Sequence, residues 1–242
     1  MISVCLASYN GEKFIQEQLR SILCQLADND EVVVSDDGSR DKTVSIIQQF
    51  NDRRIRLFCD ARKKGAGQNF DRALRQAKGE LIFLADQDDV WEKEKIITMQ
   101  AYLAEHDLAV SDCSVIDLHG NALHESFFER RRSGPGILKN LWQNTYMGCC
   151  MAFTRKILNA AVPLPQNVPM HDWWLGMVAE IVGTTVFCPE KLVRYRRHEN
   201  NETPFAGNGR LGVMQQLRFR KNLAWHLFQV WAKHHALMAD TR

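Results

Sequence analysis

Four short, largely apolar segments recur within the first ninety residues, and stretches with helical spacing separate them. The segments cover residues 2–6, 31–35, 55–58 and 81–85. Such segments are typical of strands that are buried on both faces of a parallel sheet. The stretches between them repeat apolar residues every three or four positions, as crossover helices do. The sequence therefore predicts an α/β fold whose sheet is mainly parallel, with helices on its faces and right-handed crossovers.

The second half of the chain has a less regular pattern. We expect helices over residues 92–105 and from about 172 to 182, and strands over 108–112 and 147–153. Asp172 could cap the later helix at its N-terminus. Two short strands are expected on either side of a Cys188-Pro189-Glu190 turn.

The composition fits one soluble domain, with or without appendages. Hydrophobic residues make up 45% and charged residues 25% of the 242 positions, which is ordinary for a globular protein. A net charge of +2 gives no reason to expect a nucleic-acid partner. Seven cysteines without C-x-x-C spacing argue against disulfides or a zinc site and for a reducing compartment. We expect neither a signal peptide nor a membrane-spanning helix, and therefore a cytoplasmic protein.

Three carboxylates follow the fourth apolar segment within four positions. Asp86, Asp88 and Asp89 stand where the chain leaves the predicted strand, and ligands of open α/β sheets bind at such strand ends. Clustered carboxylates are costly to bury unless a cation lies among them, and Mg²⁺ prefers carboxylates together with substrate phosphates. The alternative is a polar loop in which Asp88 or Asp89 caps the next helix.

Polar residues also follow the first and second predicted strands. Since the ends of these strands should meet at one edge of the sheet, residues 8–10 are expected near Asp36 and Asp37. The two aspartates could accept hydrogen bonds from a base or a ribose, or they could belong to an Asp-Gly-Ser turn. The glycine-rich stretch 65–67 is a weak phosphate-binding signal.

The second half offers a candidate general base. Asp172 lies between His171 and two tryptophans, and apolar walls would raise the pKa of its carboxyl. Trp173 and Trp174 could form a sugar platform or could pack in the core. A metal-hydrolase interpretation of His171 and Asp172 lacks partner histidines.

Basic residues supply further candidates. His198 could ligate a metal together with Asp88, while Arg196 and Arg197 could reach phosphate oxygens. The basic, glycine-rich stretch 129–136 could meet an anionic acceptor or be a solvated loop. The tail, residues 206–242, is basic and aromatic with helical spacing. This favours a helix lying on an anionic membrane, or one packed on the core or on a second subunit.

Five motifs together resemble those of the family 2 glycosyltransferases, which have the Rossmann-like GT-A fold. The motifs are ASYNG (7–11), DDGSRD (36–41), DQDDVW (86–91), HDWW (171–174) and YRRH (195–198). The resemblance covers roughly residues 2–201 and is closest to rhamnosyltransferase-like enzymes of bacterial surface polysaccharides such as O-antigen. It implies a GT-A domain over residues 1–205, with a nucleotide-sugar half (1–110) and an acceptor half (111–205).

The resemblance implies a role for each matching residue. Asp172 would be the catalytic base of an inverting transfer, and Asp88, Asp86 and His198 would hold Mg²⁺ or Mn²⁺. Trp173, Trp174 and Gly148 would meet the acceptor. The nucleotide sugar would be bound by Ala7, Tyr9, Asn10, Asp36, Asp37, Gln68, Asp86, Gln87 and Arg197.

The implied partners are a dTDP- or UDP-linked sugar and a glycan or lipid-linked acceptor at the inner face of the cytoplasmic membrane. dTDP-rhamnose is favoured over UDP-galactose or another UDP-hexose by resemblance alone, and the oligomeric state is open. Three other classes share parts of the pattern: an Asp/Mg²⁺ phospho-acceptor signalling domain, a nucleotidyltransferase, and an inactive sugar-binding scaffold.

Overall fold

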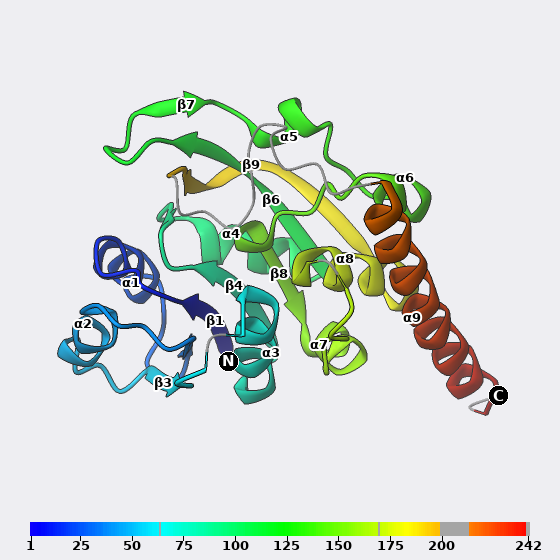
Figure 1. The fold of residues 1–242 in the computed structure, drawn as a ribbon, viewed down its shortest axis with the longest axis horizontal. Coiled ribbons are helices and arrows are strands. Elements are labelled where there is room, and N and C mark those ends of the chain that lie inside the picture. Colours follow the sequence, from blue (N-terminus) through cyan, green and yellow to red (C-terminus); the bar gives the residue numbers. More distant parts are fainter. Residues whose placement is uncertain (63, 169, 199–212, 241–242) are drawn as a thin grey trace.

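The computed structural model describes residues 1–62, 64–168, 170–198 and 213–240, which form one mixed sheet with helices on both faces (Figure 1). The sheet order is β3-β2-β1-β4-β8-β6-β9-β5, with β7 paired to β6. Within the described residues, no helix is both long and apolar enough to span a membrane. The predicted boundary between residues 205 and 206 lies outside the described residues.

The first half contains the four predicted parallel strands and their crossover helices. The strands begin and end within two residues of the predicted segments, because nearly every side chain in β1, β2 and β4 is buried between two helical layers. The elements are β1 (Ile2–Ser8), α1 (Ile15–Leu23), β2 (Glu31–Asp36), α2 (Thr43–Gln49), β3 (Ile55–Cys59), α3 (Ala66–Gln76) and β4 (Leu81–Asp86).

The register of these strands brings three strand ends to one edge of the sheet. Ala7 in β1 is paired with Ser35 in β2 on one side and with Asp86 in β4 on the other. The convergence expected from the sequence is therefore confirmed, and it places the end of β1 between two acidic strand ends.

The second half continues the sheet with both strand directions. β8 runs antiparallel to β4 and β6, and β9 runs parallel to β6. The elements are β5 (Val90–Trp91), α4 (Lys95–Leu103), β6 (Leu108–Ile116), β7 (Ala122–His124), α5 (Phe127–Arg131), α6 (Ile137–Trp142), a 3₁₀ turn (Gly148–Cys150), β8 (Met151–Thr154), α7 (Arg155–Ala161), α8 (His171–Val182), β9 (Thr185–Arg196) and α9 (Val213–Asp240).

Several expectations for this half were wrong. The two strands expected around residues 188–190 form the single strand β9, whose register against β6 shifts at Ser111 and Asp112 and so absorbs the Pro-containing segment as an irregularity. The first part of the strand expected at 147–153 is the 3₁₀ turn. Helix α5 occupies part of the segment expected to be a loop.

The structure also excludes both capping interpretations. The N-cap of α8 is Met170, so Asp172 lies in the first helical turn, where the helix dipole favours a negative charge. The N-cap of α4 is Glu94, so neither Asp88 nor Asp89 caps that helix. Capping of α4 therefore does not explain the presence of Asp88 or Asp89.

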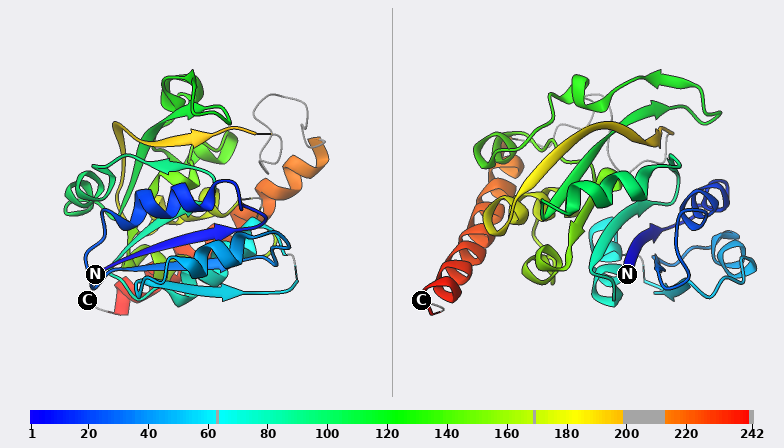
Figure 2. Two further views of the ribbon diagram at one scale, coloured as in Figure 1. Left: turned by 90° about the vertical axis from the view of Figure 1, so that its left-hand side faces the viewer. Right: turned by 180° about the vertical axis from the view of Figure 1, so that it is seen from behind.

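The helices form two layers around the sheet. Helices α1, α2 and α4 lie in one layer, and α3, α7 and α8 lie in the other (Figures 1 and 2). Helix α9 packs against α8 at the outside of the second layer. All seven cysteines are free thiols, in accord with the expectation that none forms a disulfide.

Candidate active site

The loops that follow β1 and β4 are fastened to each other by Gln87. Its amide oxygen accepts a hydrogen bond from the Tyr9 backbone N–H at 2.9 Å, and its amide nitrogen donates to the Tyr9 carbonyl at 2.9 Å. A Cβ at Gly11 would lie 2.1 Å from the Gln87 amide oxygen, so only glycine leaves room for this clamp. Gln87 thus fixes the backbone beside Ala7 and Tyr9, the residues expected to meet the nucleotide.

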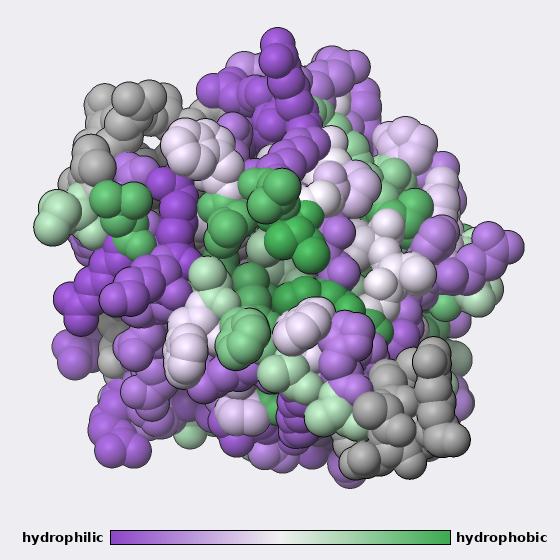
Figure 3. All heavy atoms as spheres, turned by 90° about the vertical axis from the view of Figure 1, so that its right-hand side faces the viewer, coloured by the Kyte–Doolittle hydropathy of each residue, from purple (hydrophilic) through white to green (hydrophobic). Residues whose placement is uncertain are grey.

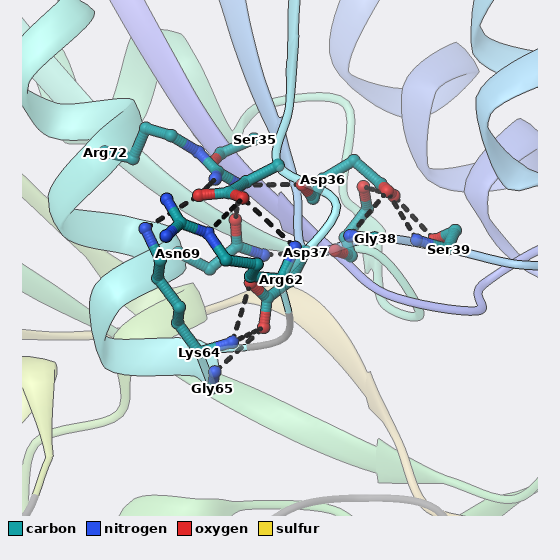
Figure 4. A network of polar contacts seen from close by, with 12 residues as sticks. Ser35, Asp36, Asp37, Gly38, Ser39, Arg62, Lys64, Gly65, Asn69 and Arg72 are labelled. Carbon is teal, nitrogen blue, oxygen red and sulfur yellow. Dashed lines mark hydrogen bonds and ion pairs between the residues drawn. The ribbon is translucent and has the colours of Figure 1, made fainter.

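The two neighbouring aspartates at the end of β2 point in different directions (Figure 4). Asp36 is fully buried and accepts hydrogen bonds from the hydroxyls of Ser8 and Ser39 and from the backbone N–H groups of Gly38 and Ser39. Asp37 accepts from the backbone N–H groups at positions 64 and 65. Turn chemistry therefore accounts for Asp36, while Asp37 fixes the loop that leads into α3.

Asn10 joins the loops after β1 and β2. Its φ of 50° is one that asparagine tolerates better than most residues. Its backbone N–H donates to the Ser39 hydroxyl at 2.8 Å, and its amide oxygen accepts from the Arg40 N–H at 2.9 Å. Asn10 therefore shapes the edge of the candidate nucleotide site through contacts within the protein.

Asp88 and His198 lie in contact, although 110 positions separate them in the chain. The Nε2 atom of His198 is 2.7 Å from Oδ2 of Asp88. The His198 ring is stacked on Phe14, with centroids 5.1 Å apart. The end of β9 is thereby held against the loop after β4.

Arg196 binds the loop that carries Asp88 and Asp89. Its backbone N–H donates to Oδ1 of Asp89 at 2.9 Å, and its Nε donates to the Asp88 carbonyl at 3.0 Å. Its Nη2 donates to Glu17 at 2.7 Å. Because these contacts leave the side chain 4% exposed, Arg196 positions the acidic loop and does not reach out to a phosphate.

The acidic loop suits a divalent cation. Burial, followed by the charges of Asp88 and Asp86, raises the pKa of Asp89, whose Oδ2 has no hydrogen-bond partner among the residues that the structure describes. A cation would relieve this crowding of negative charge. Ligand atoms of Asp86, Asp89 and Cys149 lie within 4.8 Å of one another, but a thiol suits a soft ion. The Asp88 carboxylate, in contact with the His198 imidazole, supplies the oxygen ligand that Mg²⁺ or Mn²⁺ prefers.

Asp172 has the environment of a general base. It is 6% exposed, and burial raises the pKa of its carboxyl to about 6. Its Oδ1 accepts hydrogen bonds from the Trp173 backbone N–H at 2.6 Å and from the Asn144 amide at 3.3 Å. The pKa of the Asp172 carboxyl is therefore raised, as the sequence predicted. Helix α8 and Asn144, in the segment before the 3₁₀ turn, orient the carboxylate.

His171 and Gly148 form the floor beside this carboxylate. The His171 ring is stacked on Phe70 with centroids 4.0 Å apart, and burial lowers its pKa to about 4, so the ring is neutral. A Cβ at Gly148 would lie 2.8 Å from His171 Nε2 and 3.5 Å from the Asp172 Cβ. Glycine at this position lets the 3₁₀ turn approach α8 closely.

The remaining candidate site residues differ in how deeply they are buried and in what they contact. Trp174 is 3% exposed and donates its indole N–H to the Ala161 carbonyl, so its ring packs in the core. Trp173 is half-buried and donates to the Asn140 carbonyl. The Arg197 guanidinium lies over the Tyr195 ring and donates to its hydroxyl.

A pocket of about 360 Å³ lies between the start of α3 and the segment before α8. Gln68 and Asp37 line one side of it, and Met170 and His171 line the other. The pocket thus joins residues expected at the nucleotide to the neighbour of the candidate base.

The comparisons with known proteins agree with the fold. Together they define a glycosyltransferase with the GT-A fold. Within that class the chain belongs to the family described as Glycosyl transferase family 2, whose model matches residues 3–161. This membership decides against the signalling domain and the nucleotidyltransferase that the sequence alone left open.

Two curated relatives extend over most of the chain. The dTDP-rhamnosyl transferase RfbG of Shigella flexneri is 29% identical over 90% of this chain and 82% of its own length. The Escherichia coli glucosyltransferase WfgD, named for UDP-Glc and an α-D-GlcNAc-diphosphoundecaprenol acceptor, is 28% identical over 83% of this chain and 79% of its own length.

The solved structures establish the likeness in fold. TarS 1–349 of S. aureus in complex with UDP-GlcNAc superposes with a TM-score of 0.72 and 21% identity, covering 96% of this chain and 71% of that one. This chain spans 60% of another structure of the same TarS fragment. The mannosyltransferase PcManGT of Pyrobaculum calidifontis, solved with GDP-Man and Mn²⁺, has a TM-score of 0.63 and 18% identity over 100% of this chain and 75% of its own.

Proposed function

We propose that this protein is an inverting, metal-dependent glycosyltransferase that moves a sugar from a nucleoside diphosphate to a glycan or lipid-linked acceptor. The observation that carries the proposal is the pair of carboxylate sites in one domain. One is Asp88 in contact with His198, and the other is Asp172, whose pKa is raised to about 6. The two sites suit the two ends of such a reaction.

The proposed chemistry assigns Asp172 to the acceptor. Its carboxylate takes the proton from an acceptor hydroxyl while that oxygen attacks the anomeric carbon and the bond to the diphosphate breaks. Attack opposite the leaving group inverts the anomeric centre. A base whose pKa is about 6 is ionised at neutral pH yet is still basic enough to accept a proton in the transition state.

At the other end, Asp86, Asp88 and His198 would hold the cation, and Arg196 keeps the loop that carries two of them in place. When bound, Mg²⁺ or Mn²⁺ would neutralise the charge on the departing diphosphate. The neighbouring loops, fastened by Gln87 and Asp37, would form the walls around the nucleotide.

The similarity to RfbG supports dTDP-rhamnose as the donor, and the similarity to WfgD supports a UDP-hexose as the alternative. The similarity to WfgD supports a lipid-linked acceptor, and we propose that this is an oligosaccharide of surface-polysaccharide synthesis, reached from the inner face of the cytoplasmic membrane. The basic, aromatic tail would provide peripheral contact with that membrane.

The substitution Asp172→Asn tests the proposal. It keeps the size of the side chain but removes the base, so transfer should fall by at least a hundredfold, the usual contribution of general base catalysis. The thermal stabilisation of the protein by dTDP or UDP with Mn²⁺ should persist.

The exposed carboxylate of Asp28, changed to Asn, is the matched control and should leave both measurements unchanged. Loss of nucleotide binding together with transfer in Asp172→Asn would make Asp172 a structural residue and contradict its assignment as the base. If neither dTDP nor UDP stabilises the folded wild-type protein, the nucleotide-sugar proposal is wrong.

A further inference from the structure

Helix α9 has an apolar face on each of two sides. Leu223 and Leu227 are buried, on the side where the helix packs against α8. Trp225, Phe228 and Trp231 are 59%, 56% and 47% exposed. Their rings stack on one another along the helix, with centroid distances of 6.3 and 5.9 Å. The second apolar face is therefore a row of stacked aromatic rings that is exposed to solvent.

Helix α6 extends this surface. Leu138 and Trp142 are 82% and 74% exposed. Arg220 of α9 donates to the Trp142 carbonyl at 2.7 Å, and its guanidinium lies 4.9 Å from the centre of the Trp142 ring. We call the surface made by Leu138, Trp142, Leu217, Trp225, Phe228 and Trp231 the α6–α9 face. Figure 3 shows hydrophobic side chains gathered on this side of the molecule, with hydrophilic ones around them.

Basic residues predominate along the helix that forms most of the α6–α9 face. Residues 213–240 include Arg218, Arg220, Lys221 and Lys233 but a single acid, Asp240. Exposed tryptophans flanked by basic residues suit the headgroup region of an anionic bilayer. Two copies of the chain pressed together through this face would instead bring like charges into contact, which is unfavourable.

The α6–α9 face is also connected to the candidate base. Asn140 of α6 accepts the Trp173 indole hydrogen bond at 2.7 Å, and Asn144, two residues after Trp142, donates to Asp172. The segment that carries the exposed Trp142 thus also holds the side chains around Asp172.

We infer that the α6–α9 face binds the surface of an anionic phospholipid bilayer and so holds the acceptor side of the site at the membrane. The orientation towards a lipid-linked acceptor rests on the proposed function, whereas the binding of lipid does not. This inference adds α6 to the surface and names the side chains of α9 that enter the headgroup region.

Sedimentation with vesicles tests the inference. The full chain should sediment with vesicles of phosphatidylcholine and phosphatidylglycerol, and at least tenfold more weakly with phosphatidylcholine alone. The double variant Trp225→Gln/Phe228→Gln should lose binding to both kinds of vesicle. Arg218→Gln/Lys221→Gln should bind the anionic vesicles roughly 30-fold more weakly, since two basic residues are removed from near the lipid surface.

Ile97→Gln is the matched control, because Ile97 is 72% exposed on α4, in the other helical layer, and its substitution should not alter binding. Circular dichroism of each variant checks that it is folded. Wild-type protein that stays with the supernatant, or a double variant that still binds, would overturn the inference. A dimer in sedimentation equilibrium that dissociates in the double variant, without vesicle binding, would show that a second copy covers the face.

A nucleotide thermal shift, measured on the same proteins, separates the two proposals. If vesicle binding fails while dTDP or UDP with Mn²⁺ still stabilises the protein, only the lipid surface is wrong. If vesicle binding holds while no nucleotide stabilises the protein, the lipid surface stands and the proposed function fails.

Discussion

The carboxylate of Asp172 is almost completely shielded from water. Burial raises the pKa of its carboxyl from 3.8 to about 6. If Asp172 is the base, the rate of transfer should rise as pH increases through about 6 and level off above pH 7, because only the ionised carboxylate accepts a proton. The dependence of kcat/KM on pH measures this pKa in the free enzyme.

The same shift predicts a change in stability. The folded state binds the Asp172 proton more tightly than the unfolded state, so this carboxyl costs stability as pH rises from about 4 to about 6. At pH 8 the Asp172→Asn variant should therefore be more stable to urea than the wild type, by up to about 3 kcal/mol. The difference should shrink towards zero near pH 4. A pH-independent difference would contradict the raised pKa.

Gly148 should matter both for catalysis and for folding. In Gly148→Ala, the new Cβ would lie 2.8 Å from His171 Nε2, and the stacking of His171 on Phe70 leaves the ring little room to move. We expect Asp172 to shift, with a tenfold or larger drop in kcat and a stability cost of about 1–3 kcal/mol. Steady-state kinetics and urea unfolding measure the two effects.

Gly67→Ala supplies the contrast. Gly67 lies in the first turns of α3, and a Cβ there meets nothing within 4 Å. This variant should be stabilised by about 0.5–1 kcal/mol, because alanine loses less chain entropy in a helix than glycine does. A Gly148→Ala variant that keeps the wild-type kcat would show that glycine is not needed at this position to admit His171.

At the scale of elements, Arg155 connects the start of α7 to the segment between α3 and β4. Its guanidinium donates to the carbonyls of Ala77 and Gly79, and its backbone N–H donates to the Glu80 carbonyl. Arg155→Met keeps the stem but removes the charge-assisted hydrogen bonds, so we expect a loss of about 2 kcal/mol and a Tm roughly 4–8 °C lower.

Arg75→Met removes a guanidinium of another kind. Arg75 forms an exposed pair with Asp71 one helical turn away, and such pairs contribute only about 0.3–0.5 kcal/mol. Its Tm should change by about 2 °C at most. Equal shifts in the two variants, measured by calorimetry, would mean that the carbonyl contacts of Arg155 do not stabilise α7.

The elements that could be predicted from the sequence are those with a strong local pattern. β1, β2 and β4 are apolar along their length, and their polar ends met at one edge as expected, since parallel strands share a direction. β9 could not be foreseen as one strand, because Pro189 breaks the local pattern and only pairing with β6 restores it. α6 is too short to have a helical period of its own.

Among the site residues, the sequence predicted those whose role follows from their residue type and missed one whose role depends on partners that are distant in the chain. The residue types at Asp88 and His198 indicated a metal site, and the structure brings the two side chains together. The role of Arg196 was missed, because its partners Asp89 and Glu17 are distant in the chain. A buried guanidinium beside acidic residues can be recognised only once the sheet order is known.

At the scale of the whole molecule, the candidate metal site joins the two halves of the chain. Asp88 follows β4 in the first half, His198 follows the end of β9 in the second, and their side chains are 2.7 Å apart. A ligand bound there should therefore stabilise the fold as a unit. At one hundred times its Kd, a nucleotide adds about 2.7 kcal/mol, or roughly 5–10 °C in Tm for a domain of this size.

The metal should account for much of that shift. Wild-type protein should gain more from dTDP or UDP with Mn²⁺ than from either component alone, whereas Asp88→Ala and His198→Ala should keep only the metal-independent part. His119→Ala, which removes an exposed histidine from the turn before β7, should behave like the wild type. A metal-dependent gain that survives in both site variants would move the cation elsewhere. The group formed by Asp86, Asp89 and Cys149 would then be the next place to look, with Cys149→Ser as the variant that tests it.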